Sequence, residues 1–136
     1  MTEEFRGFHA FRPDGEPAAS RWSDALQLFA APEAADAASR WERAGVLFEA
    51  RDYAGAAKLL TAVVEEYPEQ VAPRLLLARA YYHSAQLRRA EAELRAVLDR
   101  DPVEHYAHLM LGRTLQRQGR DEEAAGPLRT AAALAA

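Results

Sequence analysis

The stretch AVVEEYPEQVA, residues 62–72, is followed by a close variant of itself, AVLDRDPVEHY, at residues 96–106. Each stretch begins with small and aliphatic residues, continues through an acidic segment and then reaches a proline. The two prolines, Pro68 and Pro102, lie 34 positions apart. Self-similarity at a fixed period is the sequence signature of a repeat architecture, so the rest of the chain has to be compared at this period.

A shift of 34 positions aligns three registers, residues 37–70, 71–104 and 105–136. Positions at which all three registers hold residues of similar size indicate packing between structural units. The recurring small residues are Ala44, Ala78 and Gly112, and then Ala56, Ala90 and Ala124; the larger apolar residues are Leu47, Tyr81 and Leu115, then Leu60, Leu94 and Leu128, with a further set at Val63, Val97 and Ala131.

The spacing inside each register is helical. Ala90, Leu94 and Val97 follow one another at i, i+4 and i+7, which places them on one helix face. Turn residues interrupt the pattern at Arg51-Asp52, Ala85-Gln86 and Gly119-Arg120-Asp121, and the prolines end the second helix of a pair. The sequence therefore predicts an all-α protein of three helix-turn-helix units, stacked because one pair cannot bury its apolar face alone.

With these recurring residues and this period, the chain resembles the tetratricopeptide repeat family. The resemblance implies a short right-handed superhelical solenoid with a concave groove, formed by residues 32–136 with repeats at 37–70, 71–104 and 105–136. Arg74 and His108 depart from the family pattern, since they stand where the family favours Trp. The third repeat also contains Gly126-Pro127, which predicts a second helix that begins no earlier than Glu122 or is kinked.

Residues 1–31 lie outside the repeats and contain five aromatic residues, Phe5, Phe8, Phe11, Trp22 and Phe29. Disordered segments are normally poor in aromatic residues. Within this aromatic-rich extension, Trp22, Leu26 and Phe29 share one face of a predicted short amphipathic helix. The extension is expected to cap the first repeat, to occupy the groove of its own chain or to bind another chain.

Composition excludes several classes of function. A chain of 136 residues fits one domain, and its formal charge of −4 argues against a general nucleic-acid binder. Without cysteine it has no disulfide, thiolate nucleophile or cysteine-bound zinc.

No apolar stretch suits a membrane span and the start is acidic, so we expect a cytoplasmic protein. The single Lys against sixteen Arg, with no Ile or Asn, is typical of a GC-rich bacterium such as an actinobacterium.

Positions that differ between the three repeats are free to specialise in binding. The resemblance places twelve of them on a concave peptide-binding groove: Trp41, Phe48, Glu49, Leu75, Arg79, Tyr82, His83, Tyr106, Leu109, Arg113, Gln116 and Arg117. An aromatic and apolar wall edged by arginines suits a peptide or amphipathic helix with large side chains and a few carboxylates. In the alternative interpretation, Trp41, Phe48 and Leu75 simply complete the core.

Catalysis and metal binding have little support. His105 and His108 lie one helical turn apart, beside Asp101 and Glu104, but acidic residues are common at a helix N-terminus for electrostatic reasons. We therefore predict no catalytic residues, no metal site and no cofactor. The resulting hypothesis is a non-enzymatic adaptor whose groove binds a segment of another protein. The alternative is a homo-oligomeric structural module that self-assembles through residues 1–31 or through an open C-terminal face.

Overall fold

The computed structural model describes residues 32–136, and side chains from residue 36 onward. This part of the chain contains helices and turns but no strand, which confirms the all-α prediction. The helices are α3 (Pro32–Glu49), α4 (Tyr53–Glu66), α5 (Val71–His83), α6 (Leu87–Arg100), α7 (His105–Arg117) and α8 (Asp121–Ala135). None of them is long and apolar enough to cross a membrane. The interpretations of residues 1–31 concern residues outside the described range.

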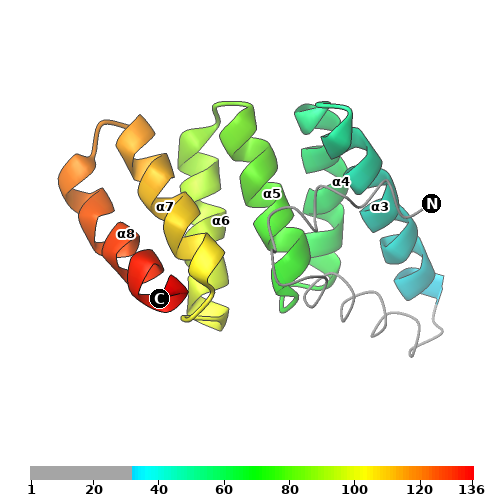
Figure 1. Cartoon of the computed structure of the whole chain (residues 1–136). Helices are drawn as coiled ribbons and strands as arrows, with labels where there is room; N and C mark the ends of the chain where they lie inside the picture. The colour runs from blue at the N-terminus through cyan, green and yellow to red at the C-terminus, as the bar shows by residue number, and fades with distance from the viewer. Residues whose placement is uncertain (1–31) are drawn as a thin grey trace.

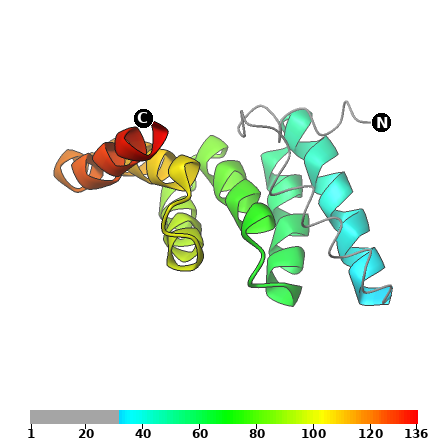
Figure 2. The same cartoon turned by 60° about the horizontal axis from the view of Figure 1, so that its bottom comes forward.

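The helices form one row in chain order, from α3 at one end to α8 at the other (Figure 1). The main contacts join α3 to α4, α5 to α6 and α7 to α8 within pairs, and α4 to α5 and α6 to α7 between pairs. In Figure 2, α7 and α8 run in a clearly different direction from α3 and α4, so the row turns along its length. This arrangement confirms the predicted solenoid of helix pairs.

Small residues stand where two helices come closest. Ala56, Ala90 and Ala124, one from each repeat, are completely buried. At Gly112, an added Cβ atom would lie 2.5 Å from both Cγ and Cδ2 of Leu128 on the facing helix. The Leu128 side chain therefore requires a residue without Cβ at position 112, and the buried alanines leave little room for larger side chains at theirs.

The predicted turns between paired helices are confirmed, and all three use the same backbone geometry. Arg51, Ala85 and Gly119, which are 34 positions apart, have φ angles of 67°, 62° and 76°. In the first turn the amide of Asp52 donates to the carbonyl of Leu47 over 2.8 Å, while Arg51 donates to Phe48 over 2.9 Å. The same pair of bonds recurs in the other two turns. These are Schellman caps, which satisfy the last carbonyl groups of a helix.

The loops between repeats are held by the residues that depart from the family pattern. The Arg74 guanidinium donates to the carbonyl oxygen of Pro68 over 3.1 Å. At the equivalent position of the next repeat, His108 Nε2 lies 2.8 Å from the carbonyl oxygen of Pro102. Both side chains therefore link the first helix of a repeat to the loop that precedes it.

The last helix begins one residue before the predicted earliest start at Glu122, while the alternative of a kink at the proline stays a prediction. α8 begins at Asp121, so Pro127 lies inside the helix, beyond its first turn. Proline has no amide hydrogen, and the carbonyl of Glu123 therefore receives no bond from position 127. The helix continues because Ala124 and Ala131 remain buried on either side of the proline.

Candidate functional site

Three of the predicted groove residues, Trp41, Phe48 and Leu75, are members of the hydrophobic core cluster. Trp41 is 2% exposed and Leu75 is fully buried, and both are members of the core cluster. Trp41 and Leu75 occupy equivalent positions in the first two repeats, so one inward-facing slot accounts for the burial of both. The alternative interpretation, in which these side chains complete the core, is the one that the structure supports.

Phe48 and the other predicted positions are accessible to different degrees. Phe48 is 8% exposed, so it is a buried member of the core cluster that still reaches the surface. Four residues are partly buried, and these are Arg79, Tyr82, Tyr106 and Leu109. Five are exposed, and these are Glu49, His83, Arg113, Gln116 and Arg117.

Seven side chains from the three repeats are linked by ring and cation–π contacts. We call them the aromatic–arginine cluster, and its members are Phe48, Tyr53, Arg79, Tyr82, His83, Tyr106 and Arg117. They come from α3, α4, α5 and α7. Six of the seven were among the predicted groove residues, and contacts in the folded chain bring them together.

One end of the cluster is a group of three rings. The Phe48 and Tyr53 rings meet edge to face with centroids 5.2 Å apart. The His83 ring stacks on Tyr53 at 5.0 Å and meets Phe48 edge to face at 5.7 Å. Edge-to-face and offset stacked arrangements are the favourable ones for aromatic rings, so this end of the cluster is well packed.

Arg79 connects all three repeats. Its guanidinium carbon lies 4.7 Å from the ring centroid of Phe48 and 5.8 Å from that of Tyr106. Desolvation by burial lowers the pKa of Arg79, against the opposing effects of Tyr106 and Glu49. The arginine is therefore a partly buried cation between two aromatic rings.

Arg117 makes the matching contact one repeat further along. Its guanidinium carbon lies 4.7 Å from the ring centroid of Tyr82, the residue equivalent to Phe48. Arg117 Nη1 also donates to the backbone carbonyl of Tyr82 over 3.0 Å. Each of these two equivalent rings is thus covered by an arginine from the first helix of the following repeat.

The electrostatic surroundings of His83 are positive. Burial lowers the pKa of His83, and repulsion from Arg79, Arg117 and Arg51 lowers it further. A histidine whose pKa is lowered in this way is largely neutral at pH 7. At pH 7 the positive charge on the exposed side of the cluster therefore comes from arginine and not from His83.

Tyr53 was not among the predicted groove residues. It is the first residue of α4, whereas all the predicted positions lie on the first helix of a repeat. A usable signal was present, because Leu87 and Asp121 stand at the equivalent positions and an aromatic residue there is specific to the first repeat.

The histidine and carboxylate group near α7 has structural roles. The Glu104 carboxylate accepts from the amide of Tyr106 over 2.9 Å and caps the helix. His108 contacts the Pro102 carbonyl, as described above. Within the described residues, no three His, Asp or Glu side chains are arranged to hold a metal ion.

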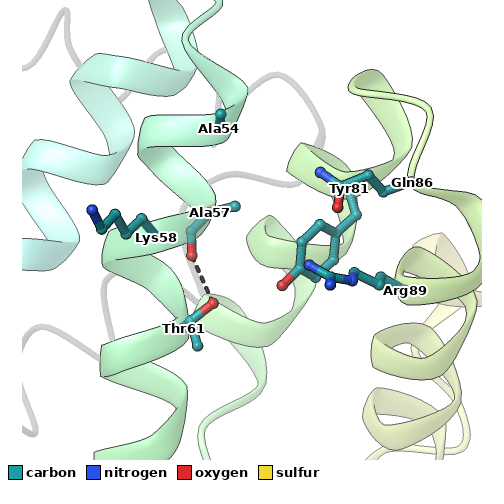
Figure 3. A pocket seen from close by; sticks show the side chains of 7 residues that line it. All are labelled: Ala54, Ala57, Lys58, Thr61, Tyr81, Gln86 and Arg89. Carbon is teal, nitrogen blue, oxygen red and sulfur yellow. Dashed lines mark hydrogen bonds between the residues drawn. The ribbon is translucent and has the colours of Figure 1, made fainter.

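A pocket of about 230 Å³ lies on another part of the surface, between α4 and the α5–α6 turn (Figure 3). Tyr81 and Arg89 form one side of it, and Arg89 lies 5.9 Å from the Tyr81 ring centroid. Thr61 donates to the Ala57 carbonyl over 2.8 Å, and Lys58 points away from Tyr81 in Figure 3. Ligand sites usually have larger volumes and converging polar groups, so this pocket is the weaker candidate.

Comparisons with known proteins agree with this architecture. Residues 47–110 match the family model described as tetratricopeptide repeat. A search of the curated proteins found no significant match.

Several solved structures of MamA are similar in fold. One MamA mutant superposes with a TM-score of 0.70 at 23% identity, covering 87% of this chain and 69% of that one. A second MamA mutant gives 0.71 at 21% identity, with coverage of 87% and 86%. A MamA chain from Desulfovibrio magneticus RS-1 gives 0.68 at 23% identity, with coverage of 96% and 69%. At these identities the likeness concerns the fold.

Proposed function

Because this chain belongs to the tetratricopeptide repeat family, we propose that it is a non-enzymatic adaptor that binds a segment of another protein across the first helices of its repeats. The observation that carries the proposal is the aromatic–arginine cluster, which joins α3, α5 and α7 through Arg79 and Arg117. Aromatic residues and arginine are the residue types most enriched among the energetic centres of protein interfaces.

The preformed geometry of the cluster favours binding. The cluster side chains already contact one another, so they lose little conformational freedom when a partner binds. The rings of Tyr82 and Tyr106 are partly exposed, and the exposed positions Arg113, Gln116 and Arg117 lie along one stretch of α7. The proposed surface therefore combines apolar area with groups that donate hydrogen bonds.

The test is a capture experiment with a matched control. Tyr82→Ala combined with Arg113→Ala removes one aromatic ring and one exposed cation from the proposed surface. Arg88→Ala combined with Arg129→Ala removes two exposed cations from other helices, α6 and α8. Immobilised full-length proteins are incubated with a lysate of the source cells, and bound proteins are identified by mass spectrometry. Circular dichroism verifies that every variant keeps its helix content and melting temperature.

A protein retained by the wild type and by the control, but lost with Tyr82→Ala and Arg113→Ala, supports the adaptor function. Equal retention by all three forms contradicts the proposed surface. Unfolding of the Tyr82→Ala and Arg113→Ala variant assigns these side chains to the core and also contradicts it.

Homo-oligomerisation is the competing function, and the same preparations test it. In that case, residues 1–31 of one chain or the exposed face of α8, which includes Leu134 at 38% exposure, bind a second copy. Light scattering on a sizing column would then give a mass that rises with concentration for the full chain. Loss of that rise on deletion of residues 1–31 identifies the extension as the assembly element.

A further inference from the structure

Within residues 36–136, some arginines pair with a carboxylate and others do not. Arg40, Arg74 and Arg120 each form an ion pair with a glutamate of another helix, at 3.1, 2.9 and 2.7 Å, and Arg95 pairs with Glu91 on its own helix at 2.9 Å. Within residues 36–136, no carboxylate pairs with Arg113 or Arg117, and both are exposed on α7. The cluster is therefore bordered by cations whose charge is not neutralised by neighbours in the described chain.

The charges around the cluster have one predominant sign. The charged groups that act most strongly on Arg79, His83 and Tyr106 are Arg51, Arg79, Arg113 and Arg117, against a single acid, Glu49. The formal charge of the whole chain is −4, so this local positive charge runs against the average. A positive patch on an acidic protein favours a negatively charged partner and disfavours like-charged ones.

The orientation of Arg117 supports the same conclusion. Its guanidinium lies against the face of the Tyr82 ring, and one of its nitrogens bonds the Tyr82 carbonyl. Stacking on a ring occupies the face of a guanidinium and leaves N–H groups at its edge for a carboxylate. The ring also limits the movement of the side chain, so less entropy is lost when an ion pair forms.

The spacing of the two arginines defines the ligand further. Arg113 and Arg117 are at i and i+4 of α7, so their Cβ atoms are separated by roughly 5–6 Å. In an extended segment, side chains at i and i+2 point to the same side and lie about 6.6 Å apart. Two acidic residues separated by one residue therefore match the pair of arginines.

Resting on the adaptor function proposed above, we infer that the bound segment comes from a separate partner protein and is acidic. Two carboxylates on alternate residues pair with Arg113 and Arg117, and a neighbouring aromatic or large aliphatic side chain packs on the exposed rings of the aromatic–arginine cluster. Two observations carry this ligand chemistry: the positive charge around the cluster, and the exposed position of Arg117 over the Tyr82 ring.

The test uses fluorescent peptides of one length in a Gly-Ser background, with the central sequences Glu-Ser-Glu-Ser-Phe, Gln-Ser-Gln-Ser-Phe and Lys-Ser-Lys-Ser-Phe. Binding to the full-length protein is measured by fluorescence anisotropy at two salt concentrations. Arg113→Gln with Arg117→Gln is the test variant. Arg88→Gln with Arg129→Gln is the control, because it removes the same charge from exposed positions elsewhere.

We expect the acidic peptide to bind at least tenfold more tightly than the Gln peptide, and the Lys peptide to bind least. The test variant should remove this tenfold preference and the control variant should retain it. Equal binding of the acidic and Gln peptides overturns the inference while leaving the adaptor function in place, because that function is judged by lysate capture. Equal losses in both variants mean a non-specific charge effect, and they also overturn it.

Two further outcomes are decisive. Failure of all three peptides to bind the full-length protein overturns the inferred ligand chemistry. A peptide of residues 1–11, which contains Glu3, Glu4 and Phe5, serves as a competitor from the chain itself. If that peptide binds more tightly than the Glu-Ser-Glu-Ser-Phe peptide and depends on Arg113 and Arg117, the assignment to a separate partner is wrong.

Discussion

The Arg79 guanidinium lies 4.7 Å from the ring centroid of Phe48, so a cation of the second repeat covers a ring of the first. Cation–π contacts are worth about 0.5–2 kcal/mol, with larger values where the cation is desolvated. Burial also destabilises the charged form of Arg79, which is why its pKa is lowered. The favourable Arg79–Phe48 contact and the unfavourable burial of the Arg79 charge therefore largely offset each other. The net gain in folding stability is small, but a cation is kept within the cluster.

Arg79→Met should change the free energy of unfolding by no more than about 1 kcal/mol, because the apolar stem is kept and the desolvation cost is removed. Arg79→Ala should destabilise the protein more than Arg79→Met, since it also removes packing against Phe48 and Tyr106. Urea unfolding followed by circular dichroism gives both values. A loss above about 3 kcal/mol for Arg79→Met would show that the charge itself stabilises the fold.

Glu91 should make stability depend on pH in the acidic range. Partial burial alone would raise its pKa, but hydrogen bonds from Arg120, Gln118 and Arg95 lower it to about 2 from 4.5. A lowered carboxyl pKa contributes stability that is fully present above pH 4.5 and is lost as the pH falls toward 2. Glu91→Gln should therefore cost about 1–3 kcal/mol at pH 7 and much less near pH 2.

Chemical unfolding of the wild type and Glu91→Gln across this pH range measures the difference directly. Glu122→Gln is the control, because Glu122 is an exposed acid on α8 for which no ion pair is formed within residues 36–136. A difference between wild type and Glu91→Gln that stays constant down to pH 2 would contradict the role of the carboxylate charge.

Ala85→Gly should stabilise the protein by roughly 0.5–1 kcal/mol, because Ala85 has a φ of 62° and glycine adopts this left-handed conformation without strain. At the equivalent position of the third repeat, Gly119→Ala should destabilise by a similar amount, since φ is 76° there. Thermal unfolding of the two variants should show shifts of opposite sign. Equal signs would mean that side-chain contacts, and not the backbone, determine these turns.

Gly112→Ala should cost roughly 1–3 kcal/mol, since its Cβ would lie 2.5 Å from Leu128. Leu128→Ala alone removes packing, but it also creates the space that the new Cβ atom needs. The double variant should therefore be less destabilised than the sum of the two single variants. Strict additivity in urea unfolding would show that the two helices adjust their separation without involving Leu128.

Ala90→Arg should unfold the middle repeat, because Ala90 is completely buried between paired helices. Ala92→Arg is the matched control on the same helix, where the side chain is exposed. Circular dichroism should show a large loss of helix for the first variant and none for the second. A folded Ala90→Arg protein would contradict the repeat register.

The sequence was sufficient to predict the helix pairs, because packing slots such as Ala56, Ala90 and Ala124 recur wherever two helices meet. It was less informative about the candidate site. Variation between repeats marked Trp41 and Leu75 as specialised, yet both vary within a buried slot that accepts different large side chains. Tyr53 stacks on His83, thirty residues away in the sequence, and no local pattern reveals that contact.

The principal contacts of this molecule join helices that are consecutive in the chain. The spacing of the two ends is therefore determined by the successive interfaces between α3 and α8, and small rotations at each of them add together. Arg79 touches rings of the first and third repeats, so its two distances are sensitive to that accumulated rotation. The curvature of the solenoid and the binding of a segment at the aromatic–arginine cluster should consequently be coupled. Pulling the two ends of the solenoid apart should weaken the binding of the segment, and a bound segment should make the solenoid more resistant to extension.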